Sequence, residues 1–117
     1  MSEDVQLVEE LVARIPGFQD LYETHIFNND SLLPHPFFWE VTQETVSSYL
    51  GDAESPDWQQ TLQFLEEQAE KGVPEIDKVI VTSFLYNLPF PGSPGHDIVD
   101  HLGPVLTRRF AELRPGG

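Results

Sequence analysis

The sequence predicts an all-α protein, built either as a compact bundle of about six short helices or as α-solenoid-like antiparallel pairs. Apolar residues recur three and four positions apart in most segments, which is the period of a helix. Glycine is followed by proline at 51–56, 72–74 and 103–104, a pattern typical of tight joints between helices. Because 39% of the 117 residues are hydrophobic, we expect a single helical domain over residues 1–117, with residues 114–117 as a frayed tail.

The N-terminal segment predicts two helices. The first spans residues 2–15, with Ser2 as its cap, and ends at a Pro-Gly pair. Its apolar stripe consists of Val5, Val8, Leu11, Val12 and Ile15. The second spans residues 18–27 and places His25 on an aromatic face. We therefore expect His25 to be a half-buried core residue and not a metal ligand.

The segment LLPHPFF, residues 32–38, contains two prolines two positions apart. A proline disfavours the helical conformation of the residue before it, so Leu33 and His35 are expected to be extended. This predicts an ordered loop lined by aromatic residues, which leads into a third helix over residues 38–50.

A fourth helix is predicted up to Lys71, with Ser55 as its cap and Pro56 in its first position. Its apolar face consists of Trp58, Thr61, Leu62, Leu65 and Ala69. Its polar face consists of Gln59, Gln63, Glu66, Glu67 and Glu70. Phe64 lies off the apolar stripe, which makes it a candidate for an exposed aromatic residue.

The segment VIVTSFLYNL, residues 79–88, could form a buried strand, since it is apolar and rich in β-branched residues. Its length and the preceding PEID start favour a helix over residues 74–88 instead. Its buried positions would be Ile76, Ile80, Phe84 and Leu88, with Val81 and Leu85 beside them. A helix that is apolar nearly all round is expected at the centre of the domain. A proline-stiffened loop over 89–95, a short helix over 96–102 and a last helix that opens at Pro104 complete the chain.

The net charge of −14 is the strongest signal in the composition. Residues 1–77 contain seventeen acidic residues and two basic ones, whereas residues 78–117 carry a net charge of +1. Such a surface repels nucleic acids and anionic membranes and attracts a basic protein partner. The acidity could equally serve solubility alone. The chain has no cysteine, no apolar run of about 20 residues and an acidic N-terminus, so we expect a cytoplasmic protein without a cofactor.

The segment GHDIVDHLGP raises the question of a metal or acid–base site. In an α-helix, His96 would lie beside Asp100, and Asp97 beside His101, and divalent metals accept both ligand types. The two histidines are five apart, which does not fit the zincin spacing of four. The alternative interpretation is a short helix whose polar pairs are structural.

The acidic helix face is the candidate for a docking surface. It comprises Glu66, Glu67, Glu70, Glu75 and Asp77, with Phe64 as a candidate anchor if it is exposed. The alternative is an ordinary solvated helix face. No calcium loop, nucleophile elbow or phosphate-binding glycine loop accompanies these residues.

The block DWQQTLQFLEEQAEKGVPEIDKVIVTSFLYNL and the later HLGPVLTRRF resemble a family of short, acidic, uncharacterised bacterial proteins. The matching residues are Phe64, Leu65, Glu66, Glu67, Phe84, Leu85, Leu88, Leu102, Gly103 and Pro104. The resemblance covers residues 55–110 and implies a helical fold. In some members it implies a gene neighbourhood typical of immunity proteins that neutralise toxins, and it implies no catalytic residue.

These observations favour a non-enzymatic, acidic binding protein, of the immunity type, that occludes the active surface of a basic bacterial toxin. Two alternatives stay open. One is a small metal-dependent enzyme that uses His96, Asp97, Asp100 and His101. The other is a helical adaptor or scaffold that binds a peptide in a groove.

Overall fold

The computed structural model describes residues 3–52 and 56–117, and within these ranges every regular element is helical. The α-helices are α1 (Glu3–Arg14), α2 (Gln19–Asn29), α3 (Pro34–Tyr49), α4 (Trp58–Glu70), α5 (Pro74–Val79) and α6 (Pro104–Leu113). The 3₁₀ and π turns are η1 (Pro16–Phe18), η2 (Ile80–Phe84), η3 (Leu85–Asn87) and η4 (His96–His101). The predicted all-α fold class is confirmed.

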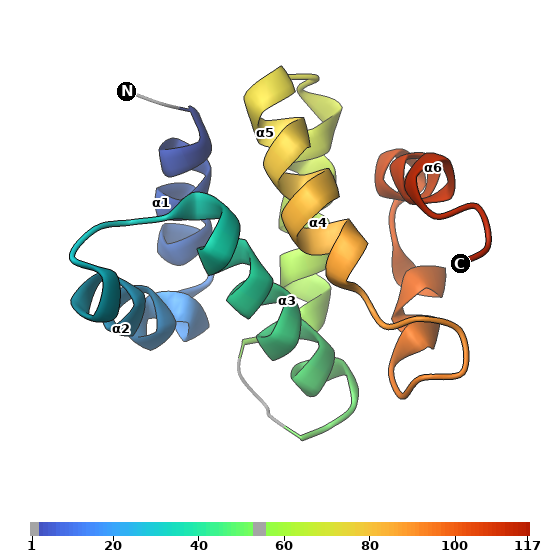
Figure 1. Cartoon of the computed structure of the whole chain (residues 1–117), viewed down its shortest axis with the longest axis horizontal. Coiled ribbons are helices and arrows are strands. Elements are labelled where there is room, and N and C mark those ends of the chain that lie inside the picture. The colour runs from blue at the N-terminus through green and yellow to red at the C-terminus, as the bar shows by residue number, and fades with distance from the viewer. Residues whose placement is uncertain (1–2, 53–55) are drawn as a thin grey trace.

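Helices α1, α3, α4 and α6 pack around the central segment formed by α5, η2 and η3, whereas α2 packs on α3. Helix α1 packs on α5, α3 packs on η2, and α6 packs on both α4 and η3. Figure 1 shows α1 and α2 at one side of the molecule and α6 with the C-terminus at the other. Helices that are distant in sequence are therefore in contact. A solenoid would bring together only consecutive units, so the compact bundle is the correct alternative.

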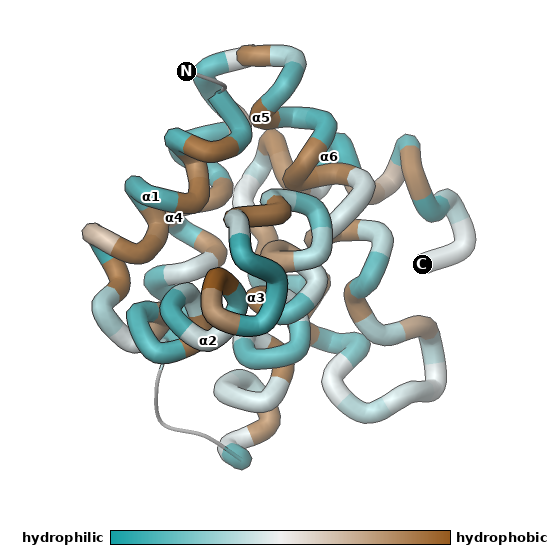
Figure 2. Tube along the Cα trace, turned by 60° about the vertical axis from the view of Figure 1, so that its left-hand side comes forward, coloured by the Kyte–Doolittle hydropathy of each residue, from teal (hydrophilic) through white to brown (hydrophobic). Residues whose placement is uncertain are grey.

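The core is one cluster of apolar side chains to which most of the helices contribute. Its largest fully buried side chains include Phe18, Phe37, Phe38, Phe64 and Phe84. Figure 2 shows hydrophobic stretches recurring along α1 between hydrophilic ones, as expected for a helix that buries one face. Across the described residues, no helix combines the length and hydropathy needed to cross a membrane.

Helix α3 starts earlier than the sequence predicted. Leu33 is extended, as expected, but Pro34 and Pro36 both lie in the first helical turn, and His35 between them is helical. The first N–H groups of a helix have no intrahelical partner, so a proline in the first turn removes no hydrogen bond. The expected aromatic-lined loop over residues 32–38 is thus mostly helix.

The central segment is helical, as predicted, but it is not a uniform α-helix. It changes from α to π at Ile80 and ends in a 3₁₀ turn. A π turn contains an extra residue and shifts the carbonyl groups out of register with their usual donors. The Ser83 carbonyl accepts hydrogen bonds from the Asn87 amide at 2.9 Å and from the Thr42 hydroxyl at 3.2 Å. These side chains stabilise the irregular turn at the centre of the fold.

Helix α4 begins two residues later than predicted. Its cap is Asp57, whose carboxylate accepts a hydrogen bond from the Gln59 N–H at 2.8 Å, so Pro56 precedes the helix. The expected caps Ser2 and Ser55 lie outside the described residues.

The C-terminal residues do not fray as expected. Arg114 is buried, with 8% of its surface exposed. Its guanidinium donates hydrogen bonds to the carbonyls of Leu88 at 2.6 Å, Pro89 at 3.0 Å and Gly117 at 2.9 Å. The same group lies over the rings of Phe90 and Phe110. The Arg114 side chain thus connects the end of α6 to the end of the central segment through hydrogen bonds.

Candidate functional site

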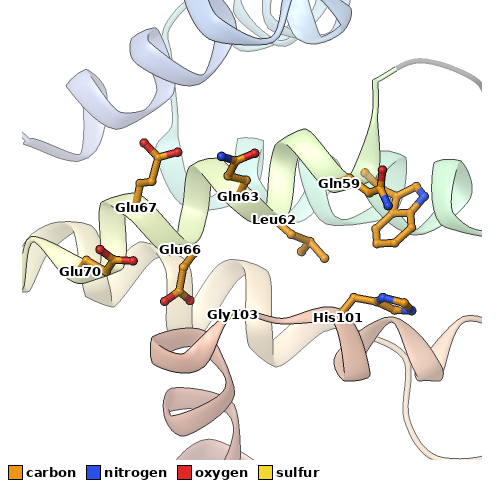
Figure 3. Close-up of a pocket in the computed structure, with 9 residues that line it drawn as sticks. Gln59, Leu62, Gln63, Glu66, Glu67, Glu70, His101 and Gly103 are labelled. Carbon is orange, nitrogen blue, oxygen red and sulfur yellow. The ribbon is translucent and has the colours of Figure 1, made fainter.

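A groove of about 460 Å³ runs between α4 and the segment that joins η4 to α6. We call it the α4 groove; its lining residues are Trp58, Gln59, Leu62, Gln63, Glu66, Glu67, Glu70, His101 and Gly103. In Figure 3, Leu62 and Glu66 point from α4 toward His101 and Gly103, whereas Gln63 and Glu67 point to the other side of α4. The groove is therefore aromatic at the start of α4 and acidic at its end.

Glu66 caps a helix that is distant in sequence. Its two carboxylate oxygens accept hydrogen bonds from the backbone N–H groups of Val105 at 2.9 Å and Leu106 at 3.0 Å. These groups lie in the first turn of α6, where a negative charge also stabilises the helix dipole. Glu66 is therefore a structural residue, and it is not available as the partner-binding residue expected from the sequence.

Gly103 makes room for this cap. A Cβ atom at Gly103 would lie 2.5 Å from the Glu66 carboxyl carbon, so any other residue here would displace the carboxylate from its hydrogen bonds. Pro104 has no N–H group, so the first donors of α6 are those that Glu66 binds. Glu66, in the acidic run of α4, and the Leu-Gly-Pro segment at the start of α6 thus contact each other directly.

The other acidic candidates do not form a single face. Glu67 pairs with Arg14 of α1 at 3.1 Å, and Asp77 pairs with Arg109 of α6 at 3.1 Å. Glu75 is exposed and accepts a 3.3 Å hydrogen bond from the N–H of Glu3.

Among the acidic candidates, Glu70 differs in that its carboxylate makes no polar contact within the described part of the chain. It is exposed in the last turn of α4, and its side chain takes part in none of the hydrogen bonds or ion pairs among the described residues. Within the acidic end of the α4 groove, it is therefore the group best placed to meet a partner.

Phe64 is not an exposed anchor, because only 1% of its surface is accessible. It packs in the core, and Arg14 lies over its ring at 5.1 Å from the centroid. Phe64 is buried although it lies off the apolar stripe, because α4 is covered on two sides, by α1 as well as by α3. In α3, Phe37 and Phe38 are buried and Trp39 is half exposed.

The aromatic end of the α4 groove was not predicted from the sequence. The centroid of the His101 ring lies 5.0 Å from that of Trp58 and 5.6 Å from that of Tyr49. The rings of Trp58 and Tyr49 meet edge to face, with their centroids 4.9 Å apart. Partial burial, and then the carboxylates of Asp97 and Asp100, raise the pKa of Tyr49. The signal in the sequence was the spacing of Trp58 and Leu62, four apart on one helix face.

The His/Asp pairs expected over residues 96–101 do not form, because η4 is a 3₁₀ helix. In this helix residues three apart are aligned, whereas the predicted pairs needed residues four apart. His96 binds the Pro89 carbonyl through Nδ1 at 2.8 Å. Within residues 3–52 and 56–117, no three His, Cys, Asp or Glu side chains gather where they could hold a metal ion.

His25 is more deeply buried than expected, with 3% of its surface exposed. Its Nε2 accepts a hydrogen bond from the Leu33 N–H at 3.0 Å, and its Nδ1 lies 3.1 Å from the Glu40 carboxylate. His25 therefore joins α2 to the start of α3, which is a structural role.

Comparison with known proteins gives one match. Residues 8–114 match the profile of a family described as "Domain of unknown function (DUF7674)". Neither a curated protein nor a solved structure matches the chain.

Proposed function

We propose that this chain, which belongs to the DUF7674 family of unknown function, is a non-enzymatic cytoplasmic protein that binds a basic protein partner at the acidic end of the α4 groove. One observation carries the proposal: Glu70 stands exposed beside an open groove, with no hydrogen-bonding role among the described residues. Glu67 lies next to it, held by Arg14 on an exposed surface.

The placement of these carboxylates supports a binding role. The C-terminal end of a helix carries partial negative charge, so acidic residues in the last turn of α4 are unfavourable for the helix. Glu66 is compensated by α6 and Glu67 by Arg14, but Glu70 has no such partner among the described residues. Departures from local stability rules concentrate at functional sites. A cationic group of a partner would remove the unfavourable interaction at Glu70.

The long-range field supports a basic partner. With a net charge of −14, the chain attracts a cationic protein and raises its association rate, by roughly 10 to 1,000-fold in steered complexes. The gene neighbourhood that the sequence resemblance implies for some family members suggests a concrete partner: a basic toxin domain, such as a nuclease, whose active surface is cationic. Binding would cover that surface and stop the toxin by steric occlusion.

Co-expression tests this function. The protein encoded by the reading frame next to this one would be produced in a bacterial host, with and without the present chain. We expect that protein alone to arrest growth, the pair to restore growth, and the two purified proteins to form a stoichiometric complex in which the toxin activity is lost.

Two results would contradict the proposal. One is that the neighbouring protein forms no complex with this chain at low salt. The other is that a complex forms while the full activity of the neighbouring protein persists, which would exclude occlusion as the mechanism.

A further inference from the structure

The polarity of the α4 groove changes in one direction along α4. Trp58, Leu62, Glu66 and Glu70 are each four residues apart, so they follow one row of the helix surface. The row begins with an aromatic and an aliphatic side chain and ends with two carboxylates. His101 adds a second ring at the first end, against Trp58. A ligand that fills the groove must therefore be apolar at one end and cationic at the other.

The length of α4 sets the spacing between these two ends. The middle of the apolar pair lies about ten residues of helix from Glu70, the carboxylate that is free to meet a cation, or about 15 Å at 1.5 Å per residue. Four residues of an extended peptide cover about 13 Å at 3.3 Å each, and the long side chain of an arginine or lysine reaches the remaining distance. Side chains four apart in an extended chain point to the same side, so both could enter the groove together.

We propose that the α4 groove binds an extended segment of the partner protein in which an apolar side chain and an arginine or lysine lie four residues apart. This inference rests on the proposed function and specifies what the basic partner presents. The apolar side chain lies between Trp58, Leu62 and His101. The arginine or lysine lies at Glu70, where its positive charge compensates a carboxylate that no contact among the described residues neutralises.

Two synthetic peptides of equal composition test the spacing. Both are seven residues long, acetylated and amidated, and consist of Ser and Gly apart from one Phe and one Arg. The first has Phe at its second position and Arg at its sixth, and the other has them at its second and third. Binding is followed by the fluorescence of Trp58 in the Trp39→Phe variant, because these are the two tryptophans of the chain and Trp39 lies on α3.

We expect the spaced peptide to bind at least tenfold more tightly than the adjacent one. Glu70→Gln should weaken binding of the spaced peptide about fivefold or more, consistent with loss of a charge-assisted contact. Glu112→Gln is the matched control, since Glu112 is also an exposed acidic residue in the last turn of a helix and does not line the groove. This control should bind like the parent.

Equal affinities for the two peptides would overturn the inference, as would equal effects of the Glu70 and Glu112 variants. No response of Trp58 to millimolar spaced peptide would overturn it as well. None of these results touches the proposed function, because complex formation with the neighbouring gene product is measured separately with whole proteins.

Discussion

Replacing Arg114 by alanine is expected to destabilise the protein by about 3 kcal/mol, which is a large fraction of the stability of a small domain. The substitution removes the donors that bind the carbonyls of Leu88 and Pro89, at the end of the central segment. Carbonyl groups at a helix end have no intrahelical partner, and buried ones need a donor. The rings of Phe90 and Phe110 also lose the cation that lies between them.

Thermal and urea unfolding measure this effect. We expect the melting temperature to fall by about 10 °C or more. Arg108→Ala is the control, since Arg108 is exposed on the same helix and should change stability by less than about 0.5 kcal/mol. A loss no greater for Arg114→Ala than for Arg108→Ala would show that the C-terminal residues do not fasten the fold.

The second large effect is expected at Gly103. In Gly103→Ala, the new methyl group would displace the Glu66 carboxylate, and the N–H groups of Val105 and Leu106 would lose their acceptor. We expect a loss of about 2 kcal/mol in the free energy of unfolding. The backbone of Gly103 is extended, so the cost arises from space and not from backbone conformation.

A double-mutant cycle with Glu66→Ala isolates this contact. Once the carboxylate is removed, Gly103→Ala should cost much less, because the methyl group then has nothing to displace. Gly116→Ala serves as the control, since a Cβ atom there meets no atom within 4 Å. If the losses of stability from Gly103→Ala and Glu66→Ala were additive in the double variant, the Gly103 position would not be coupled to the Glu66 carboxylate.

Local sequence patterns predicted most of the fold. Helical spacing located the apolar stripes of α1, α4 and the central segment, and the Gly-Pro joints located the start of α5 and α6. The errors occurred where two local rules competed. Residues before proline usually avoid helix, but His35 is helical, since a first turn tolerates both prolines.

Contacts between distant residues could not be predicted in the same way. The pattern placed Glu66 on the polar face of its helix, because nothing local shows that the N–H group of Val105, 39 positions later, lies beside it in the first turn of α6. Arg114 looked like part of a tail because two of its acceptors, the carbonyls of Leu88 and Pro89, precede it by more than 20 residues. The α4 groove could not be predicted for the same reason, because His101 and Trp58 meet only in the folded chain.

The structural roles of Glu66 and Glu67 limit which carboxylates of the acidic face can be substituted in a test of partner binding. A charge reversal at Glu66 would disturb α6, so any loss of binding could reflect the fold. A reversal at Glu67 would break the ion pair with Arg14. Glu70 avoids both problems, because no described contact of the fold depends on it.

The most direct measurement is the dissociation constant of the complex with the neighbouring gene product for Glu70→Lys and for Glu112→Lys. These variants change the net charge equally, so they separate a local contact from the overall field. We predict that Glu70→Lys raises the dissociation constant more than tenfold at low salt, that Glu112→Lys raises it less than about threefold, and that the difference shrinks in 0.5 M salt. Equal effects of the two variants would show that the acidic end of the α4 groove is not the binding site.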